Sequence, residues 1–157
     1  MKKTLLILCL LLLVGCSNQA NGMANPMTSR DSLEEVNEIT HGNITRPGVM
    51  GITQEGFYTI ETKEGIIGEY DFVLNDVGYT IRFSDTIVNN DISGVYIDGN
   101  PAFSDDLSVT QAEGADLKLA RWFNTDGQYV FMAPNTVSDD VFRAMYDEVS
   151  ALTNIKN

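Results

Sequence analysis

The side chains of this sequence that could do chemistry are two cysteines, one histidine and many carboxylates. The sequence contains no Gly-x-Ser-x-Gly elbow, no phosphate-binding glycine loop, no dinucleotide fingerprint and no His-Glu-x-x-His motif. A serine or cysteine nucleophile needs a general base, and His41 is the only histidine. Because His41 and Gly42 suit the end of a helix, we interpret His41 as a helix-end residue and assign no catalytic residue.

Two pairs of adjacent carboxylates, Asp105-Asp106 and Asp139-Asp140, are the obvious candidates for acid-base or metal chemistry. Neither pair fits a calcium loop, which needs acidic residues at alternating positions, a glycine and a later glutamate. A zinc site would have to be built largely from carboxylates, against the usual ligands of zinc. We interpret Asp139-Asp140 as helix capping and Asp105-Asp106 as a solvated loop, and we expect no bound metal.

Cys16 follows a segment with the layout of an export signal, in which Lys2 and Lys3 precede an uncharged apolar run. As a helix, the run from Leu5 to Gly15 would be about 16 Å long, too short for a hydrocarbon core of ~30 Å. Its end, Leu13-Val14-Gly15-Cys16, resembles the bacterial lipobox, in which diacylglycerol is attached to the cysteine before cleavage. We therefore expect residues 1–15 to be a lipoprotein signal peptide and Cys16 to be lipidated. The alternative is an ordinary secretory signal with a chance cysteine.

Lipidation of Cys16 would hold the protein on the outer face of the bacterial cell membrane, because two acyl chains anchor stably where one does not. Without residues 1–15, the chain keeps 8 Lys and Arg against 22 Asp and Glu, a formal charge near −14. Such a surface repels phosphate backbones and anionic headgroups. We exclude nucleic acid as a partner and expect the membrane contact to rest on the lipid, with no cofactor beyond this covalent diacylglycerol.

Removal of residues 1–15 leaves 142 of the 157 residues, which is enough for one domain with a real core. Residues 17–28 have small and amide side chains, no charge and no periodicity. We interpret residues 16–28 as a lipid-anchored flexible tether and residues 29–157 as a single domain. Cys9 leaves with the signal and Cys16 is acylated, so packing rather than a disulfide must stabilise this domain.

Both ends of the domain have the pattern of an amphipathic helix. Ser32-Leu33-Glu34-Glu35 fits a capping box in which Glu35 reaches back to the amide of Ser32, and the helix should end near Thr40. Ser138-Asp139-Asp140 should begin the last helix. Its apolar stripe consists of Val141, Phe142, Met145, Tyr146, Val149 and Leu152.

Between the helices the apolar residues alternate, which predicts hairpins. With Asn75-Asp76-Val77-Gly78 as the first loop, the predicted opposite pairs are Leu74 with Tyr79, Phe72 with Ile81, Tyr70 with Phe83, and Asp71 with Arg82. Residues 89–101 should be a long connection containing a short strand. Asp126-Gly127 suits a type I′ turn, and the predicted pairs there are Phe123 with Val130 and Trp122 with Phe131.

These elements predict an α+β fold: an antiparallel sheet of hairpins with a short N-terminal helix and a C-terminal amphipathic helix packed on it. The second hairpin is apolar on both sides, with Trp122, Tyr129 and Phe131 on one of them. Either a helix or loop covers this aromatic side, or the three residues form an exposed interaction patch.

The chain resembles a group of uncharacterised small surface lipoproteins of Gram-positive bacteria that share a domain of unknown function. The segments that carry the resemblance are Asn25-Pro26-Met27, Ser32-Leu33-Glu34-Glu35-Val36-Asn37, Tyr79 to Arg82, Asp91-Ile92-Ser93-Gly94-Val95-Tyr96, Ala120-Arg121-Trp122 and Tyr129. The resemblance implies a location and one intact domain, and it brings no catalytic residue.

Three functions are compatible with the sequence. The first is a non-enzymatic, membrane-anchored module that binds an extracellular protein, peptide or small ligand. The second is a carrier of lipid or another apolar ligand in a cavity under the sheet. The third is a carboxylate-based hydrolase, which needs two acids facing each other across a cleft.

Overall fold

The computed structural model describes residues 27–87, 90–94, 110–111 and 117–153. These residues form one antiparallel sheet of seven strands, in the order β1-β2-β3-β4-β7-β6-β5, and two helices. The helices are α2 (Leu33–Thr40) and α3 (Asp139–Thr153). The strands are β1 (Met27–Ser29), β2 (Ile52–Glu61), β3 (Ile66–Leu74), β4 (Val77–Ser84), β5 (Thr110–Gln111), β6 (Leu117–Asn124) and β7 (Gly127–Pro134).

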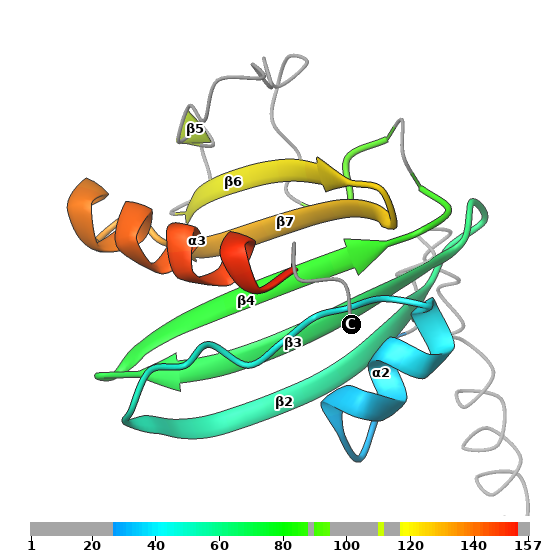
Figure 1. The fold of residues 1–157 in the computed structure, drawn as a ribbon, viewed down its shortest axis with the longest axis horizontal. Coiled ribbons are helices and arrows are strands. Elements are labelled where there is room, and N and C mark those ends of the chain that lie inside the picture. Colours follow the sequence, from blue (N-terminus) through cyan, green and yellow to red (C-terminus); the bar gives the residue numbers. More distant parts are fainter. Residues whose placement is uncertain (1–26, 88–89, 95–109, 112–116, 154–157) are drawn as a thin grey trace, which may run out of the picture.

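The predicted α+β arrangement of an antiparallel sheet with a short first helix and a C-terminal helix is confirmed at this level (Figure 1). Both helices lie on the same face of the sheet. The sheet begins two residues earlier than the predicted domain start at 29, because Met27 and Thr28 already pair with Ile60 and Thr59 of β2. Neither helix among the described residues has the length and apolar character needed to cross a membrane.

The first predicted hairpin is present as β3 and β4, but its predicted register was wrong by two residues. Only Asn75 and Asp76 form the turn, and Leu74 lies opposite Val77. Both turn residues have positive φ, 52° and 62°, which is the type I′ geometry. Asn and Asp tolerate this conformation, so the turn is tighter than the predicted four-residue loop. A shift of two preserves the alternation, and the predicted faces of both strands are therefore correct.

The second hairpin, β6 and β7, also has a different register from the predicted one. Trp122 lies opposite Tyr129 rather than Phe131, and Phe123 lies opposite Gln128 rather than Val130. The turn residues are Thr125 and Asp126, neither with positive φ, so the turn is not type I′. Gly127 belongs to β7, where a Cβ would lie 2.3 Å from the carbonyl oxygen of Ser84. This glycine is required by close packing against the end of β4 and not by the turn.

Helix α2 begins and ends where the sequence predicts. The Ser32 hydroxyl accepts from the Glu35 amide at 3.2 Å, but Glu35 accepts from the Asp31 amide at 3.0 Å instead of the predicted Ser32 amide. His41 ends the helix with φ 53°. The helix packs directly onto β3 at Gly68, where a Cβ would lie 2.8 Å from Val36. The absence of a side chain at Gly68 therefore sets how closely α2 approaches the sheet.

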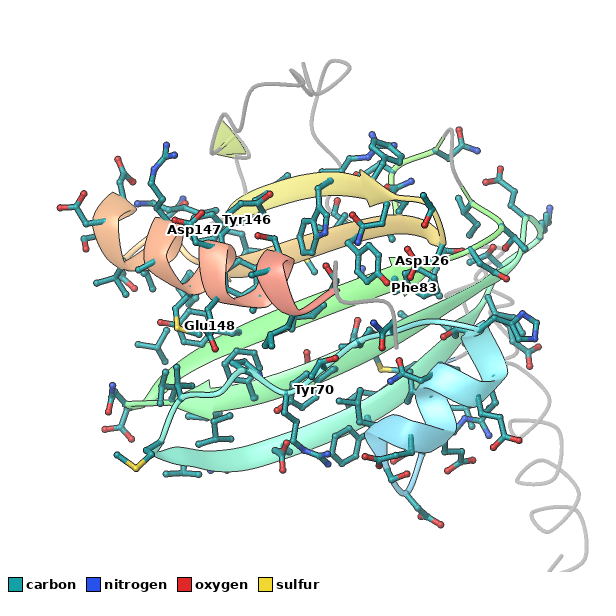
Figure 2. The ribbon with its side chains drawn as sticks, in the orientation of Figure 1. Tyr70, Phe83, Asp126, Tyr146, Asp147 and Glu148 are labelled. Atoms are coloured by element: carbon teal, nitrogen blue, oxygen red, sulfur yellow. The ribbon has the colours of Figure 1, made fainter. Side chains whose placement is uncertain are left out.

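The core between the helices and the sheet is built largely from aromatic side chains. Stacked pairs run across the sheet from Phe57 to Phe131, with ring centroids 5.2–5.8 Å apart. Helix α3 buries Phe142, Met145, Tyr146 and Val149, whereas Val141 of the predicted stripe is 49% exposed. The loop from α2 to β2, residues 41–51, crosses the same face (Figure 1), and its Gly48 amide donates to Glu148 of α3 at 3.0 Å (Figure 2). The helix side of the sheet is thus filled.

Candidate functional site

The three residues of the predicted interaction patch lie on the helix-covered face, where Trp122 and Phe131 contact Tyr146 and Phe142 of α3 and Tyr129 packs between Trp122 and Phe83. Tyr129 and Phe131 are 0% exposed, and Trp122 is half-buried. The Trp122 ring stacks on Tyr129 at 5.3 Å and meets the edge of Tyr146 of α3, also at 5.3 Å (Figure 2). The exposed-patch interpretation is therefore wrong, and the alternative, a covered aromatic face, is correct. The sequence could not decide because it does not show which face α3 covers.

Hydrogen bonds fix these aromatic residues as structural ones. The Trp122 indole donates to the Thr153 hydroxyl at 3.2 Å, which ties β6 to the end of α3. The Tyr129 hydroxyl donates to Asp126 at 2.7 Å, and burial raises the pKa of Tyr129 well above its ordinary value. Both polar atoms are thus satisfied inside the protein and are not available to a partner.

The other residues considered in the sequence have separate locations. His41 ends α2 as predicted, with its Nδ1 3.1 Å from the Asp85 carboxylate. Asp139 and Asp140 lie in the first turn of α3, and Asp139 also pairs with the buried Lys118. Cys16 and Asp105-Asp106 lie outside the described residues, as does most of the connection 89–101. Within the described ranges, no group of three or more His, Cys, Asp or Glu is placed to hold a metal ion.

The opposite face of the sheet carries no helix among the described residues, and we call it the helix-free face. One end of it is closed by an apolar cluster that joins the sheet to the segment after β4. Gln128, fully buried, holds that segment by donating to the carbonyls of Ile87 at 2.8 Å and Asn90 at 3.0 Å. The members of the cluster are Ile60, Ile67, Ile87, Ile92, Leu119, Val130 and Met132.

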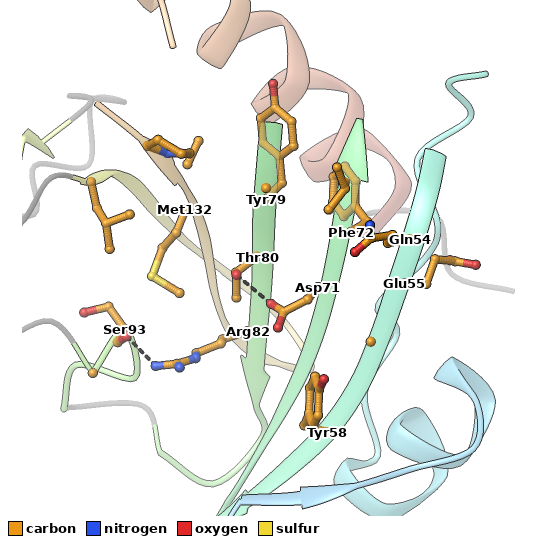
Figure 3. Close-up of a pocket in the computed structure, with 17 residues that line it drawn as sticks. Gln54, Glu55, Tyr58, Asp71, Phe72, Tyr79, Thr80, Arg82, Ser93 and Met132 are labelled. Atoms are coloured by element: carbon orange, nitrogen blue, oxygen red, sulfur yellow. Dashed lines mark hydrogen bonds between the residues drawn. The ribbon is translucent and has the colours of Figure 1, made fainter. Parts of the chain in front are cut away.

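Beyond this cluster the helix-free face is hollowed into a groove of about 610 Å³ (Figure 3). The strand register brings Gly56, Asp71, Thr80 and Met132 into one row across β2, β3, β4 and β7. Gly78 lies one row along, and a Cβ there would meet nothing within 4 Å. The groove is lined mainly by Gln54, Gly56, Tyr58, Asp71, Val73, Gly78, Thr80, Arg82, Ser93, Gly94, Leu117 and Met132.

Arg82 forms one side of the groove and is held by three acceptors. Its Nε donates to Glu69 at 2.5 Å, and its Nη1 donates to the carbonyl of Ile92 at 3.2 Å and to that of Ser93. Glu69 is only 3% exposed, and burial raises its pKa although the Arg82 guanidinium opposes the shift. Arg82 and Glu69 thus form a buried ion pair that also fastens the segment 92–93 to the sheet.

Asp71 is the carboxylate on the groove floor. Its Oδ1 accepts from the Thr80 hydroxyl at 2.6 Å across the strands (Figure 3). Its Oδ2 has no hydrogen-bond or ion-pair partner in the described part of the chain. The predicted partner of Asp71 was Arg82, but the register shift gives Arg82 to Glu69. Asp71 is therefore left with one free oxygen and an uncompensated charge facing the groove.

The sequence reading missed this groove, although a signal for it was present. Gly56 and Gly78 interrupt alternating strand segments, and an isolated glycine in a strand indicates a bulge or the close approach of another group. Here Gly78 leaves open space beside Val73, one row along from Asp71, whereas the Tyr58 ring occupies the space beside Gly56, 2.8 Å from where a Cβ would lie. No protein-family model, curated protein or solved structure matches this chain.

Proposed function

We propose that this protein is a lipid-anchored lipoprotein on the outer face of the bacterial cell membrane, and that its domain binds a ligand in the groove without catalysing a reaction. The groove carries the proposal. Its volume, about 610 Å³, lies within the roughly 300–1,000 Å³ of small-ligand sites. It combines an apolar wall of Val73, Leu117 and Met132 with a few convergent polar groups, the usual composition of such sites.

The positions of the carboxylates favour binding over hydrolysis. A carboxylate-based hydrolase needs two acids facing each other across a cleft. Asp71 and Glu69 instead lie two residues apart on the same strand, and Glu69 is buried against Arg82. The stacked rings on the helix side likewise favour the open groove over a ligand cavity beneath the helices.

The proposed location on the outer face of the membrane rests on the sequence around Cys16 and on the resemblance to small Gram-positive surface lipoproteins. This location is tested by measuring the intact mass of the protein purified from its native membrane. We expect loss of residues 1–15 and a diacylglyceryl addition, and no such addition in a Cys16→Ser variant. An unmodified, released protein would overturn the anchor.

The groove is tested by filling it. Gly78→Val adds a side chain where the structure has open space, in a strand position that suits valine. Extracellular amines, sugars, amino acids and carboxylates are screened by ligand-observed NMR, and any hit is repeated on Gly78→Val and on Ala144→Val, an exposed position of α3. A hit that Gly78→Val loses and Ala144→Val keeps supports the groove. Hits that all survive in Gly78→Val contradict it.

A further inference from the structure

We infer that the groove selects a ligand with a primary alkylammonium group, such as a lysine side chain, and that Asp71 receives the ammonium. This inference rests on the proposed function, since it names the ligand class of the same groove.

The charges around the groove leave one acid without a partner. Arg82 is neutralised by Glu69. Glu55 lies opposite Phe72, so its side chain is on the helix-covered face, where it accepts from Arg46 at 2.8 Å and from Tyr70 at 2.7 Å. Asp71 has only the neutral hydroxyl of Thr80. The chain without residues 1–15 also carries a formal charge near −14, from 8 basic and 22 acidic residues. Both the local and the overall field therefore attract a cation and repel an anion.

The hydrogen-bonding capacity of Asp71 favours an ammonium over a guanidinium. A guanidinium binds a carboxylate best through two parallel hydrogen bonds to both oxygens. Because Thr80 occupies Oδ1, Asp71 presents one free oxygen, which suits the point charge of an ammonium. Arg82 is equally unsuited to an anion. Its Nε already donates to Glu69 and its Nη1 to the carbonyls of Ile92 and Ser93, so no pair of adjacent N–H groups remains to bind an anion through two parallel hydrogen bonds.

The apolar wall fits the stem of such a ligand. Val73 lies on the same face as Asp71 and two residues along β3, and Met132 lies opposite Thr80 on the neighbouring strand. Leu117 and the bare backbone of Gly78 continue this surface. An extended chain of methylenes can pack here while its charged end contacts Asp71.

The inference is tested on the full chain, purified from membranes in detergent, with three probes. These are the Nα-acetyl methylamides of L-lysine, L-norleucine and L-arginine, which share a similar stem and differ in the end group. Calorimetry should show the lysine probe binding at least tenfold more tightly than the other two, because only its end group matches the single free oxygen of Asp71.

Two variants separate local recognition from overall charge. Asp71→Asn keeps the acceptor for Thr80 and should weaken lysine-probe binding roughly tenfold or more. Asp147→Asn, exposed on α3, makes the same change in net charge and should leave binding unchanged. Equal binding of the norleucine probe, tighter binding of the arginine probe, or no effect of Asp71→Asn overturns the inference.

Gly78→Val keeps this result distinct from the proposed function. If the lysine probe does not bind but another ligand is lost in Gly78→Val, the groove stands and the ammonium assignment is overturned. If Gly78→Val weakens the binding of no ligand of any class, both the proposed binding groove and the ammonium assignment are overturned.

Discussion

Replacing Arg82 by methionine should destabilise the domain by about 3–5 kcal/mol at pH 7, because it leaves the buried Glu69 carboxylate without its cation. Methionine keeps an apolar stem of similar length, so the loss comes from the charge and from the carbonyls of Ile92 and Ser93. Set against a typical domain stability of about 5–15 kcal/mol, this effect is large. The double variant Glu69→Gln/Arg82→Met removes both charges and should be more stable than Arg82→Met alone.

The pH dependence of this loss has a definite sign. Burial already raises the folded-state pKa of Glu69 above its ordinary value of 4.5, and Arg82 is the main opposing influence. Without Arg82 the pKa rises further, so the folded protein takes up a proton more readily than the unfolded chain. Stability then falls as pH rises from about 4.5 through the folded-state pKa. The deficit of Arg82→Met should therefore shrink as the pH is lowered from 7 toward 5.

Urea unfolding of both variants and the parent protein measures these differences. Trp122, the single tryptophan, stacks on Tyr129 and contacts Tyr146 of α3, and its fluorescence reports the loss of this packing. A deficit that stays constant between pH 7 and pH 5, or an Arg82→Met variant as stable as the parent, would refute the buried-pair reasoning. The double variant should lack the added pH dependence of Arg82→Met, since glutamine does not titrate.

Three further predictions test the fold. Phe131→Ala should cost about 3–5 kcal/mol in urea unfolding, because Phe131 is a fully buried core residue; a loss under 1 kcal/mol would favour the exposed patch. Gly68→Ala should lower the free energy of unfolding by about 1–3 kcal/mol, because its Cβ would lie 2.8 Å from Val36. Gly78→Ala, which has open space around it, should leave this free energy unchanged. Equal effects of the two variants would contradict the packing of α2 on β3. Asp76→Gly should raise the thermal midpoint by relieving the φ of 62° in the type I′ turn, and a lower midpoint would argue against the two-residue turn.

The elements and faces of this fold could be predicted because they depend on local patterns. The capping serine at position 32 and the alternation in β3 and β4 determine where those elements form and which side chains point inward. Hairpin registers could not be predicted, since they depend on turns that compete closely. Asn75-Asp76 forms a tight type I′ turn. Asp126-Gly127, for which that turn was predicted, does not, because Gly127 belongs to β7 and packs beside Ser84.

The candidate site depends on those registers and on which face the helices cover. A shift of two residues moved Arg82 from Asp71 to Glu69, and this difference turns a surface pair into a buried one and leaves Asp71 free in the groove. The aromatic residues singled out in the sequence belong instead to the core on the helix-covered face. The Asn75-Asp76 turn decided the first outcome, and the long-range packing of α3 decided the second.

The central claim is that ligand binds in the groove on the helix-free face, and amide chemical-shift mapping tests it most directly. A ligand that binds the isotope-labelled protein is titrated in, and the backbone amides that shift are assigned. We expect the largest shifts at Asp71, Gly78, Thr80 and Met132, which line the groove on three strands. Shifts confined to α2, α3 or the loop from α2 to β2, with the groove amides unmoved, would contradict the account.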